Sequence, residues 1–379
     1  MDPAAHKRTF HTLDAMRGIG AVLIAIHHAP DLFGGWAAGG TSVAVDLFFA
    51  MSGIVISRAY EGRFARGMSV AAFLRLRLIR LYPLYLVGLV LGALNAAASL
   101  WGHGILGWTW DRLGMALVLG LAMLPGPAPF GDGRLFALNI PAWTLFFELV
   151  VNIGYAALLP RLTNRRLLGL CLACVPALLV AACLMGDLNR GALVSDAAIG
   201  LLRTVFSFSA GLLIGRTMVT HRFRRSLPGF LLLVGVVVLT LLLPIPSGIR
   251  PFYDTAVLVI GMPLMAVLAI HVEPPRWLVP ACTASGLVSY AVYMIHVPVF
   301  ALVASLAGRF GAGGIAAWAP VSGCVILAVV VGAGWLLDRC YDAPLRRILM
   351  TRVKDAGRGG ARNQAPLRQP PGRPEAAEA

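Results

Sequence analysis

Charged side chains are scarce in this chain. They make up 13% of the 379 residues, whereas hydrophobic residues make up 58%, and the mean hydropathy is +0.79. A soluble domain fills its core with much less apolar sequence, so this composition excludes a soluble protein. It predicts a chain that crosses a membrane several times.

Acidic residues are the scarcer of the two charge types. The chain has 17 Asp and Glu against 32 Lys and Arg, for a formal net charge of +15. In a soluble protein this excess would suggest binding to nucleic acid. In a membrane protein it is typical of the basic cytoplasmic loops that fix orientation, so we expect no nucleic-acid partner.

Cysteine and the common catalytic motifs are also rare or missing. The chain has six cysteines, mostly within apolar runs, and the Cys171-x-x-Cys174 pair has no second Cys/His pair. We therefore expect neither a disulfide framework nor a bound metal. No H-E-x-x-H, Walker loop or G-x-S-x-G occurs, so a metalloprotease, an ATPase and a nucleophile-elbow hydrolase lack support.

Long apolar segments are abundant. Ten segments can cross a bilayer, and alternating them places every major basic cluster on one side. The sequence thus predicts an all-α integral membrane protein with about ten transmembrane helices and both termini in the cytoplasm. A further apolar piece, 114–124, has about half the length of a span, and we expect it to be re-entrant or interfacial. The predicted spans are 13–30, 41–60, 81–98, 142–159, 167–185, 197–214, 227–243, 254–270, 287–307 and 315–337.

The two ends of the chain differ from this central part. Lys7 and Arg8 precede the first span, and no clear small-x-small cleavage site follows, which favours a retained signal anchor. From about Thr351 the chain is polar and rich in Gly, Pro and Ala. We expect one membrane domain over residues 1–350 and a disordered cytoplasmic tail over 351–379.

The first span carries ionisable residues, which are costly in a membrane and mark a functional site by default. Arg17 lies near its start, and His27 and His28 near its end. Eleven residues separate Arg17 from His28, about 20° from a whole number of helical turns, so both lie on one face about 16 Å apart. His27 points about 80° away from that face. The alternative is a snorkelling arginine with two interfacial histidines.

The second and third spans contain further candidates. Asp46 precedes Ser52-Gly53 in the second span. A carboxylate there needs a cationic partner or water, and Arg17 is one hairpin away, although pairing with backbone near the interface is an alternative. Gly53 would permit close helix approach or a break in the helix.

A group of basic residues lies at the predicted cytoplasmic end of the third span. These arginines could hold a polyanion such as a nucleotide phosphate, or act only as orientation signals. The group consists of Arg75, Arg77 and Arg80, followed by Tyr82-Pro83.

Two later spans add polar residues. Glu148 lies one to two turns into its span and could orient an imidazole or an acceptor hydroxyl, or pair with Arg17. Ser289, Tyr293 and His296 are spaced i, i+4 and i+7, so they share one helix face. A core histidine satisfied by its neighbours is the alternative for His296.

Taken together, these stretches resemble the acyltransferase 3 family of polytopic membrane O-acyltransferases over about residues 10 to 350. The similarity is carried by LDAMRGIGAVLIAIHH, VDLFFAMSGIVIS, RLRLIRLYPLY, AWTLFFE, SYAVYMIHVPVF and YDAPLRR. The sequence departs from the family pattern at Ile54, where Phe is usual, and at Val150-Val151-Asn152, where aromatics are common. These departures affect the expected acceptor or acyl specificity more than the reaction.

The resemblance implies transfer of an acyl group, often acetyl, from cytoplasmic acyl-CoA to a hydroxyl of a carbohydrate or lipid-linked glycan, in the bacterial inner (cytoplasmic) membrane. It picks out Arg17 and His28, with His28 as general base or transient acyl carrier and Arg17 positioning the donor. We expect Glu148 to complete the catalytic set. The expected donor site is Arg75, Arg77, Arg80 and Tyr82, and the expected substrate contacts are Asp46, Ser52, Tyr293 and His296. The expected partners are thus acyl-CoA, the acceptor and membrane lipids. The alternative function is non-enzymatic export of a glycolipid or polysaccharide.

Overall fold

Helices make up almost all of the computed structural model, which describes residues 9–36, 39–101, 108–127, 131–219, 223–309 and 315–362. Two short strands, β1 (Arg224–Arg225) and β2 (Val272–Glu273), pair in parallel. The longer helices are α1 (His11–His27), α2 (Ala44–Phe64), α3 (Val70–Trp101), α4 (Trp110–Leu121), α5 (Ala142–Leu158), α6 (Asn164–Met185), α7 (Ala197–Thr217), α8 (Leu227–Leu242), α9 (Arg250–Ala256), α10 (Met262–His271), α11 (Val279–Arg309), α12 (Val321–Leu337) and α13 (Ala343–Arg362). Two π-helical segments, Val257–Gly261 and Asp338–Asp342, join α9 to α10 and α12 to α13. The remaining elements are 3₁₀ turns at Pro30–Phe33, Thr41–Val43, Gly131–Gly133, Leu159–Arg161, Val194–Asp196, Arg276–Leu278 and Ala316–Trp318.

The fold is that of an all-α, multi-pass membrane protein, as the sequence predicts. Within the described residues, eight helical stretches are long and apolar enough to cross a membrane. Two more predicted spans correspond to shorter helices, α1 with 17 residues and α8 with 16. Each of the ten predicted spans therefore has a helical counterpart.

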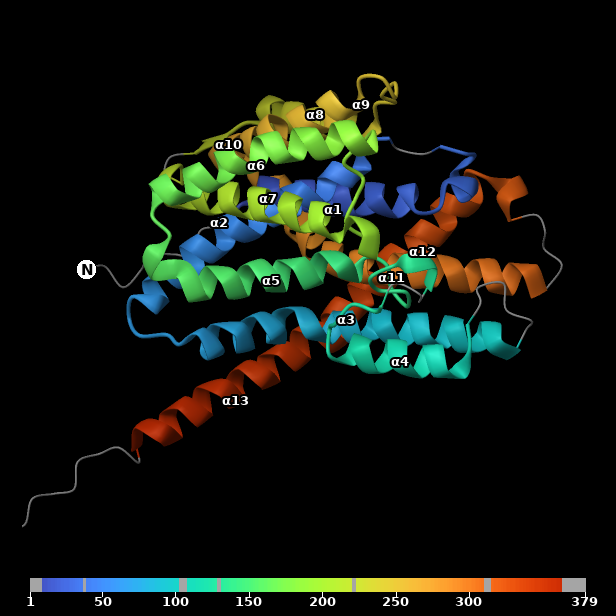
Figure 1. Ribbon diagram of the computed structural model, residues 1–379, viewed down its shortest axis with the longest axis horizontal. Coiled ribbons are helices and arrows are strands. Elements are labelled where there is room, and N and C mark those ends of the chain that lie inside the picture. The colour runs from blue at the N-terminus through green and yellow to red at the C-terminus, as the bar shows by residue number, and fades with distance from the viewer. Residues whose placement is uncertain are drawn as a thin grey trace, which may run out of the picture.

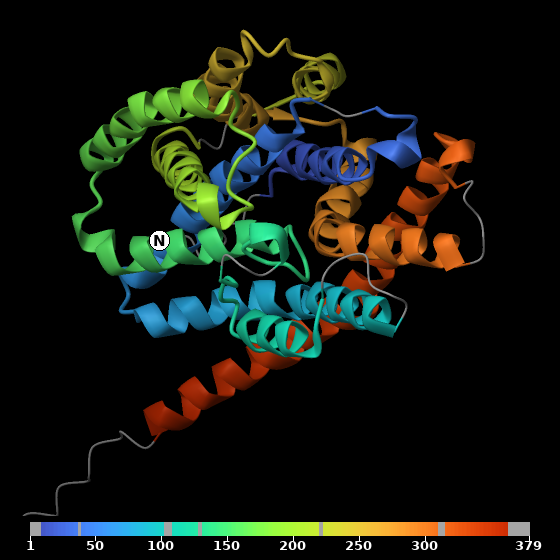
Figure 2. The same cartoon turned by 45° about the vertical axis from the view of Figure 1, so that its right-hand side comes forward.

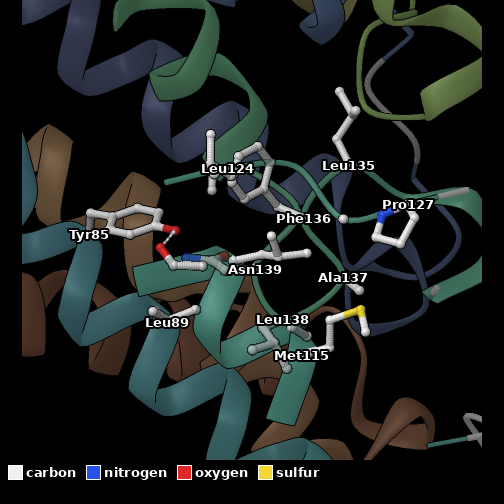
Figure 3. A pocket seen from close by; sticks show the side chains of 15 residues that line it. Tyr85, Leu89, Met115, Leu124, Pro127, Leu135, Phe136, Ala137, Leu138 and Asn139 are labelled. Atoms are coloured by element: carbon white, nitrogen blue, oxygen red, sulfur yellow. Dashed lines mark hydrogen bonds between the residues drawn. The ribbon is translucent and has the colours of Figure 1, made fainter. Parts of the chain in front are cut away.

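The extra apolar piece forms α4, a helix of 12 residues. At 1.5 Å per residue it is about 18 Å long, too short to cross a hydrocarbon layer of about 30 Å. It lies beside α3 (Figures 1 and 2) and is tied to it by hydroxyl groups: Tyr82 donates to the Leu121 carbonyl at 2.7 Å and Tyr85 to the Gly120 carbonyl at 2.6 Å. A cavity of about 20 Å³ between α3, α4 and the 124–142 segment (Figure 3) has room for about one water molecule.

The start of α1 and the far end of α13 lie at the same end of the helix bundle (Figure 1). α13 runs as far as Arg362, beyond residue 350, where the composition places the end of the membrane domain. The remainder of the predicted tail, 363–379, lies outside the described residues.

Two helix pairs pack unusually closely because glycine provides the contact. A Cβ at Gly18 of α1 would lie 1.8 Å from the Ser285 hydroxyl oxygen of α11, and a Cβ at Gly53 of α2 would lie 2.3 Å from the Phe208 carbonyl of α7. Small residues let helix backbones approach in a membrane. The prediction that Gly53 permits close approach is confirmed, and the α1–α11 contact brings two of the sequence motifs together.

Candidate active site

A cavity of about 180 Å³ lies between α1, α2, α3, α5 and α11. Its wall is apolar over the α2 side and polar where α1, α3, α5 and α11 meet. It collects side chains from five of the sequence stretches that carry the family resemblance. The lining residues are Arg17, Val45, Phe48, Phe49, Met51, Ser52, Val55, Arg77, Arg80, Leu81, Thr144, Leu145, Glu148, Ser289, Tyr290 and Tyr293.

Glu148 is bound in the cavity wall by two neighbours. Its Oε1 accepts a hydrogen bond from the Ser52 hydroxyl at 2.7 Å and is ion-paired with Arg77. The structure thus answers one open alternative: the cationic partner of Glu148 is Arg77 of α3, and Arg17 has other partners. Arg77 is buried, and its charge is already balanced by Glu148.

Arg17 is held by two hydrogen bonds to α11 and one to Asp14 of α1. Its Nε donates to the Ser289 hydroxyl at 3.0 Å, and its Nη2 donates to the Gly286 carbonyl at 2.5 Å and to Asp14 Oδ1 at 3.2 Å. Asp14 lies one turn earlier on α1, and its ion pair with Arg17 fixes the orientation of the guanidinium. The guanidinium still lines the cavity. Asp14 is not among the residues predicted from the sequence, although a carboxylate in the first turn of a span is a signal of the same kind as Arg17.

The three arginines of the third span do not all lie at the cavity. Arg80 lines the cavity, and it makes no hydrogen bond or ion pair within the described part of the chain. Arg75 is exposed and points away from the cavity. Helical phase explains this, because Arg77 and Arg80 lie about 60° apart around the helix axis, whereas Arg75 lies about 160° from Arg77. Tyr82 also lies outside the cavity, bound to α4.

Asp46 does not pair with Arg17, contrary to the sequence-based expectation. Its carboxylate is fully buried and binds Arg203 of α7 at 2.6 Å and the Ser207 hydroxyl at 3.3 Å. Arg203 also donates to the carbonyls of Leu188 and Arg190. Asp46 is therefore part of a buried polar cluster outside the cavity. Arg203 was missed, although an arginine inside the predicted 197–214 span was a visible signal.

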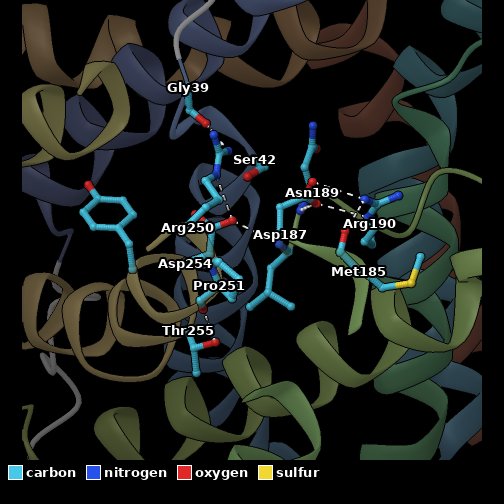
Figure 4. A network of polar contacts seen from close by, with 12 residues as sticks. Gly39, Ser42, Met185, Asp187, Asn189, Arg190, Arg250, Pro251, Asp254 and Thr255 are labelled. Carbon is cyan, nitrogen blue, oxygen red and sulfur yellow. Dashed lines mark hydrogen bonds and ion pairs between the residues drawn. The ribbon is translucent and has the colours of Figure 1, made fainter. Parts of the chain in front are cut away.

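The same cluster continues into the 187–190 connection and α9 (Figure 4). Asp254 Oδ2 accepts from the Leu188 backbone N–H at 3.0 Å and from Arg250 Nε at 3.2 Å, and Arg250 also binds the Gly39 carbonyl. These contacts join segments that are distant in sequence. Their burial and backbone partners indicate a structural role.

Tyr293 forms the end of the cavity nearest to His296. Its ring lies edge-on to Phe48, with ring centres 6.1 Å apart, and its hydroxyl accepts a hydrogen bond from the Thr144 hydroxyl at 3.2 Å. On the other side, the Tyr293 ring centre lies 5.8 Å from that of His296. Tyr293 and Phe48 thus separate the cavity from the histidines.

His28 and His296 lie in contact beyond this aromatic pair. His28 Nδ1 is 3.0 Å from His296 Nε2, and His296 Nδ1 is 3.1 Å from the Val292 carbonyl. The His28 side chain is exposed, whereas His296 is fully buried; neither lines the cavity. Arg17 and His28 therefore both face α11, as their helical phase predicts.

A proline fixes the backbone next to His296. Pro298 has no N–H, so the Met294 carbonyl four residues earlier lacks its usual helical donor. Asn139 Nδ2 donates to that carbonyl at 2.9 Å, and Asn95 Nδ2 donates to the Pro298 carbonyl at 2.7 Å. Asn139, in the loop before α5, thereby ties α5 to the part of α11 that carries His296.

Among the described residues, no group of three or more His, Cys, Asp or Glu side chains could hold a metal ion. The cavity wall contains three arginines and the carboxylate Glu148. The exposed imidazole of His28 lies beyond Tyr293. Such groups suit the binding of an anionic ligand and proton transfer to or from a hydroxyl.

Comparison with known proteins identifies the family of this chain. A family model described as an acyltransferase domain matches residues 10–338. "Protein 2 in picA locus" of Rhizobium radiobacter is 38% identical over 186 residues, covering 46% of this chain and 94% of that protein. No solved structure matches the chain. The family match covers most of the chain and includes the cavity and both histidines, so the chain belongs to the acyltransferase 3 family and is a multi-pass membrane acyltransferase.

Proposed function

We propose that this protein moves an acetyl group from cytoplasmic acetyl-CoA to a hydroxyl of a carbohydrate or glycolipid, in the bacterial inner membrane. The observation that carries the proposal is the cavity itself. It holds the Arg80 guanidinium without an ion-pair partner in the described structure, and it ends at Tyr293, next to the His28–His296 pair. Because Tyr293 and Phe48 lie between this cavity and the histidines, the proposal requires this aromatic pair to move aside when the donor thioester reaches His28.

Each group has a role in the proposed reaction. Arg80 binds a phosphate of the donor, and Arg17, held by Ser289 and Gly286, positions the donor in the cavity. Glu148 keeps Arg77 neutralised and, with Ser52, shapes the polar wall. The donor site is thus smaller than the sequence predicts, because Arg75 and Tyr82 lie outside it.

The chemical step moves the acetyl group from the sulfur of CoA to the hydroxyl oxygen of the acceptor. His28 Nε2 removes the proton of the acceptor hydroxyl as its oxygen attacks the thioester carbonyl. The carbon–sulfur bond breaks, and the CoA thiolate takes the proton from the His28 imidazolium. The acetyl ester and free CoA–SH are the products.

Reconstitution with radiolabelled acetyl-CoA tests the proposal. Proteoliposomes that contain the protein and a glycolipid extract of the host membrane should transfer label from the acetyl group to the glycolipid fraction. Protein carrying His28→Ala should not. Movement of unlabelled glycolipid across the bilayer, without any label in it, would instead support the export function and would overturn the proposal.

A further inference from the structure

The hydrogen bonds of His296 determine where its proton lies. Its Nδ1 lies 3.1 Å from the Val292 carbonyl oxygen on the preceding turn of α11. A carbonyl oxygen can only accept, so Nδ1 of His296 carries the proton. The side chain is fully buried, and its other nitrogen, Nε2, faces His28 at 3.0 Å.

The same logic extends to His28. In a neutral imidazole one nitrogen donates and the other accepts, so Nε2 of His296 is an acceptor. Nδ1 of His28 must then be the donor in the 3.0 Å contact between the two rings. This leaves the lone pair of a neutral His28 on Nε2; the Ile24 backbone, one turn earlier on α1, is a further hydrogen-bond partner of the His28 ring.

We propose that His296 is a positioning residue that holds His28 in the tautomer with an unprotonated Nε2, the form in which it can act as a base. The inference rests on the proposed role of His28 and adds a residue that acts through it. The hydrogen bond at one ring nitrogen selects which nitrogen holds the proton, and His296 supplies that hydrogen bond from a rigid helix. Neither His296 nor the Val292 carbonyl touches the cavity or carries a charge in this arrangement.

The contact also favours the product of proton transfer. When His28 Nε2 takes the hydroxyl proton, His28 becomes a cation whose Nδ1–H still points at His296 Nε2. A hydrogen bond from an ionised donor is stronger than one between neutral groups. His296 therefore selects the basic form of His28 before transfer and stabilises the imidazolium afterwards.

Three variants separate this role from packing. His296→Phe keeps a ring of similar size but offers no acceptor, whereas His296→Gln can present a carbonyl oxygen to His28. His271→Phe is the matched control, because His271 on α10 makes the same contact with the carbonyl four residues earlier, Nδ1 to Val267 at 2.8 Å, but has no contact with His28.

The direct measurement is ¹⁵N NMR of histidine-labelled protein in lipid nanodiscs, with the His28 signals assigned by their loss in His28→Ala. We expect an unprotonated Nε2 in the wild type, in His271→Phe and in His296→Gln, and a protonated Nε2 population in His296→Phe. Label transfer from acetyl-CoA should fall about 10–100-fold in His296→Phe, mainly in kcat, and recover in part in His296→Gln, as is usual for residues that orient a functional histidine.

The possible results are distinct. A protonated Nε2 in the wild type, or an unchanged tautomer and rate in His296→Phe, would overturn the inference alone. A fully active His28→Ala protein would overturn the proposed role of His28, even if the NMR spectra show the expected tautomer. If His296→Phe does not fold, His296→Gln decides the matter through its tautomer and its rate.

Discussion

At the scale of single residues, the two adjacent histidines of α1 are separated by their surroundings. His28 contacts His296 and has an exposed side chain, whereas His27 lies about 100° away around the helix. We expect His28→Ala to lose about 10²–10⁴-fold of the transfer rate, because a general base contributes that much. His27→Ala should lose far less. Transfer assays at equal membrane levels of protein will check this, and equal losses at both positions would contradict the phase argument.

The arginines of α3 provide a second comparison between neighbours. Arg80 lines the cavity, and Arg75 is exposed outside it. Arg80→Gln should raise the KM for acetyl-CoA about tenfold or more, since a charge-assisted hydrogen bond to phosphate contributes about 1.5–3 kcal/mol. Arg75→Gln, the same chemical change, should leave that KM within about twofold. A similar rise in both variants would mean that general positive charge, and not the cavity, attracts the donor.

Asp46 should behave as a structural residue. Asp46→Ala leaves the fully buried Arg203 without its carboxylate, and breaking a buried pair costs about 3–5 kcal/mol. We expect a large fall in thermal stability and in the yield of folded protein. Asp187→Ala breaks a half-exposed pair with Arg190 and should cost only about 0–1 kcal/mol. A stable Asp46→Ala protein with a raised KM would instead place Asp46 at a substrate.

At the scale of helices, the contact between α1 and α11 decides whether the site assembles. Arg17 and His28 are both bound by α11, and Gly18 allows the two backbones to approach. Gly18→Val would insert methyl groups where Ser285 lies, so the helices must separate. Overpacking costs about 1–3 kcal/mol, and displaced catalytic groups reduce the rate further.

Transfer activity and thermal stability of Gly18→Val should therefore both fall. Gly235→Val on α8 is the control, because a Cβ there has nothing within 4 Å. An active, stable Gly18→Val protein would show that the close helix approach is not required.

At the scale of the whole molecule, the orientation in the membrane follows from charge. The basic loops after α2 and α5 lie at the end of the bundle where α1 starts (Figure 1), and we expect this end in the cytoplasm. A cysteine placed at Asn164, in a cysteine-free background, should react with a membrane-impermeant reagent only after the cells are opened. Labelling in intact cells would invert the topology and place the donor cavity toward the outside.

The class of the fold and most candidate residues follow from local features of the chain. Apolar length and loop charge are local properties, so they predicted a helical counterpart for each span. The helical phase of Arg17 and His28 is local too, and it correctly placed both on one face. Helical phase also separates Arg75 from Arg77 and Arg80, which charge alone groups together; the structure leaves only Arg77 and Arg80 in the cavity wall.

Which charges pair depends on how the helices pack. Asp46 could have reached any of several cations, and helix packing selected Arg203 rather than Arg17; packing likewise paired Glu148 with Arg77. The contact between His28 and His296 joins residues 268 positions apart, and no local pattern reports such a distance. The physical reason is that an ion pair or hydrogen bond needs atoms within about 3 Å, and in a helical membrane protein that proximity is determined by how the helices pack.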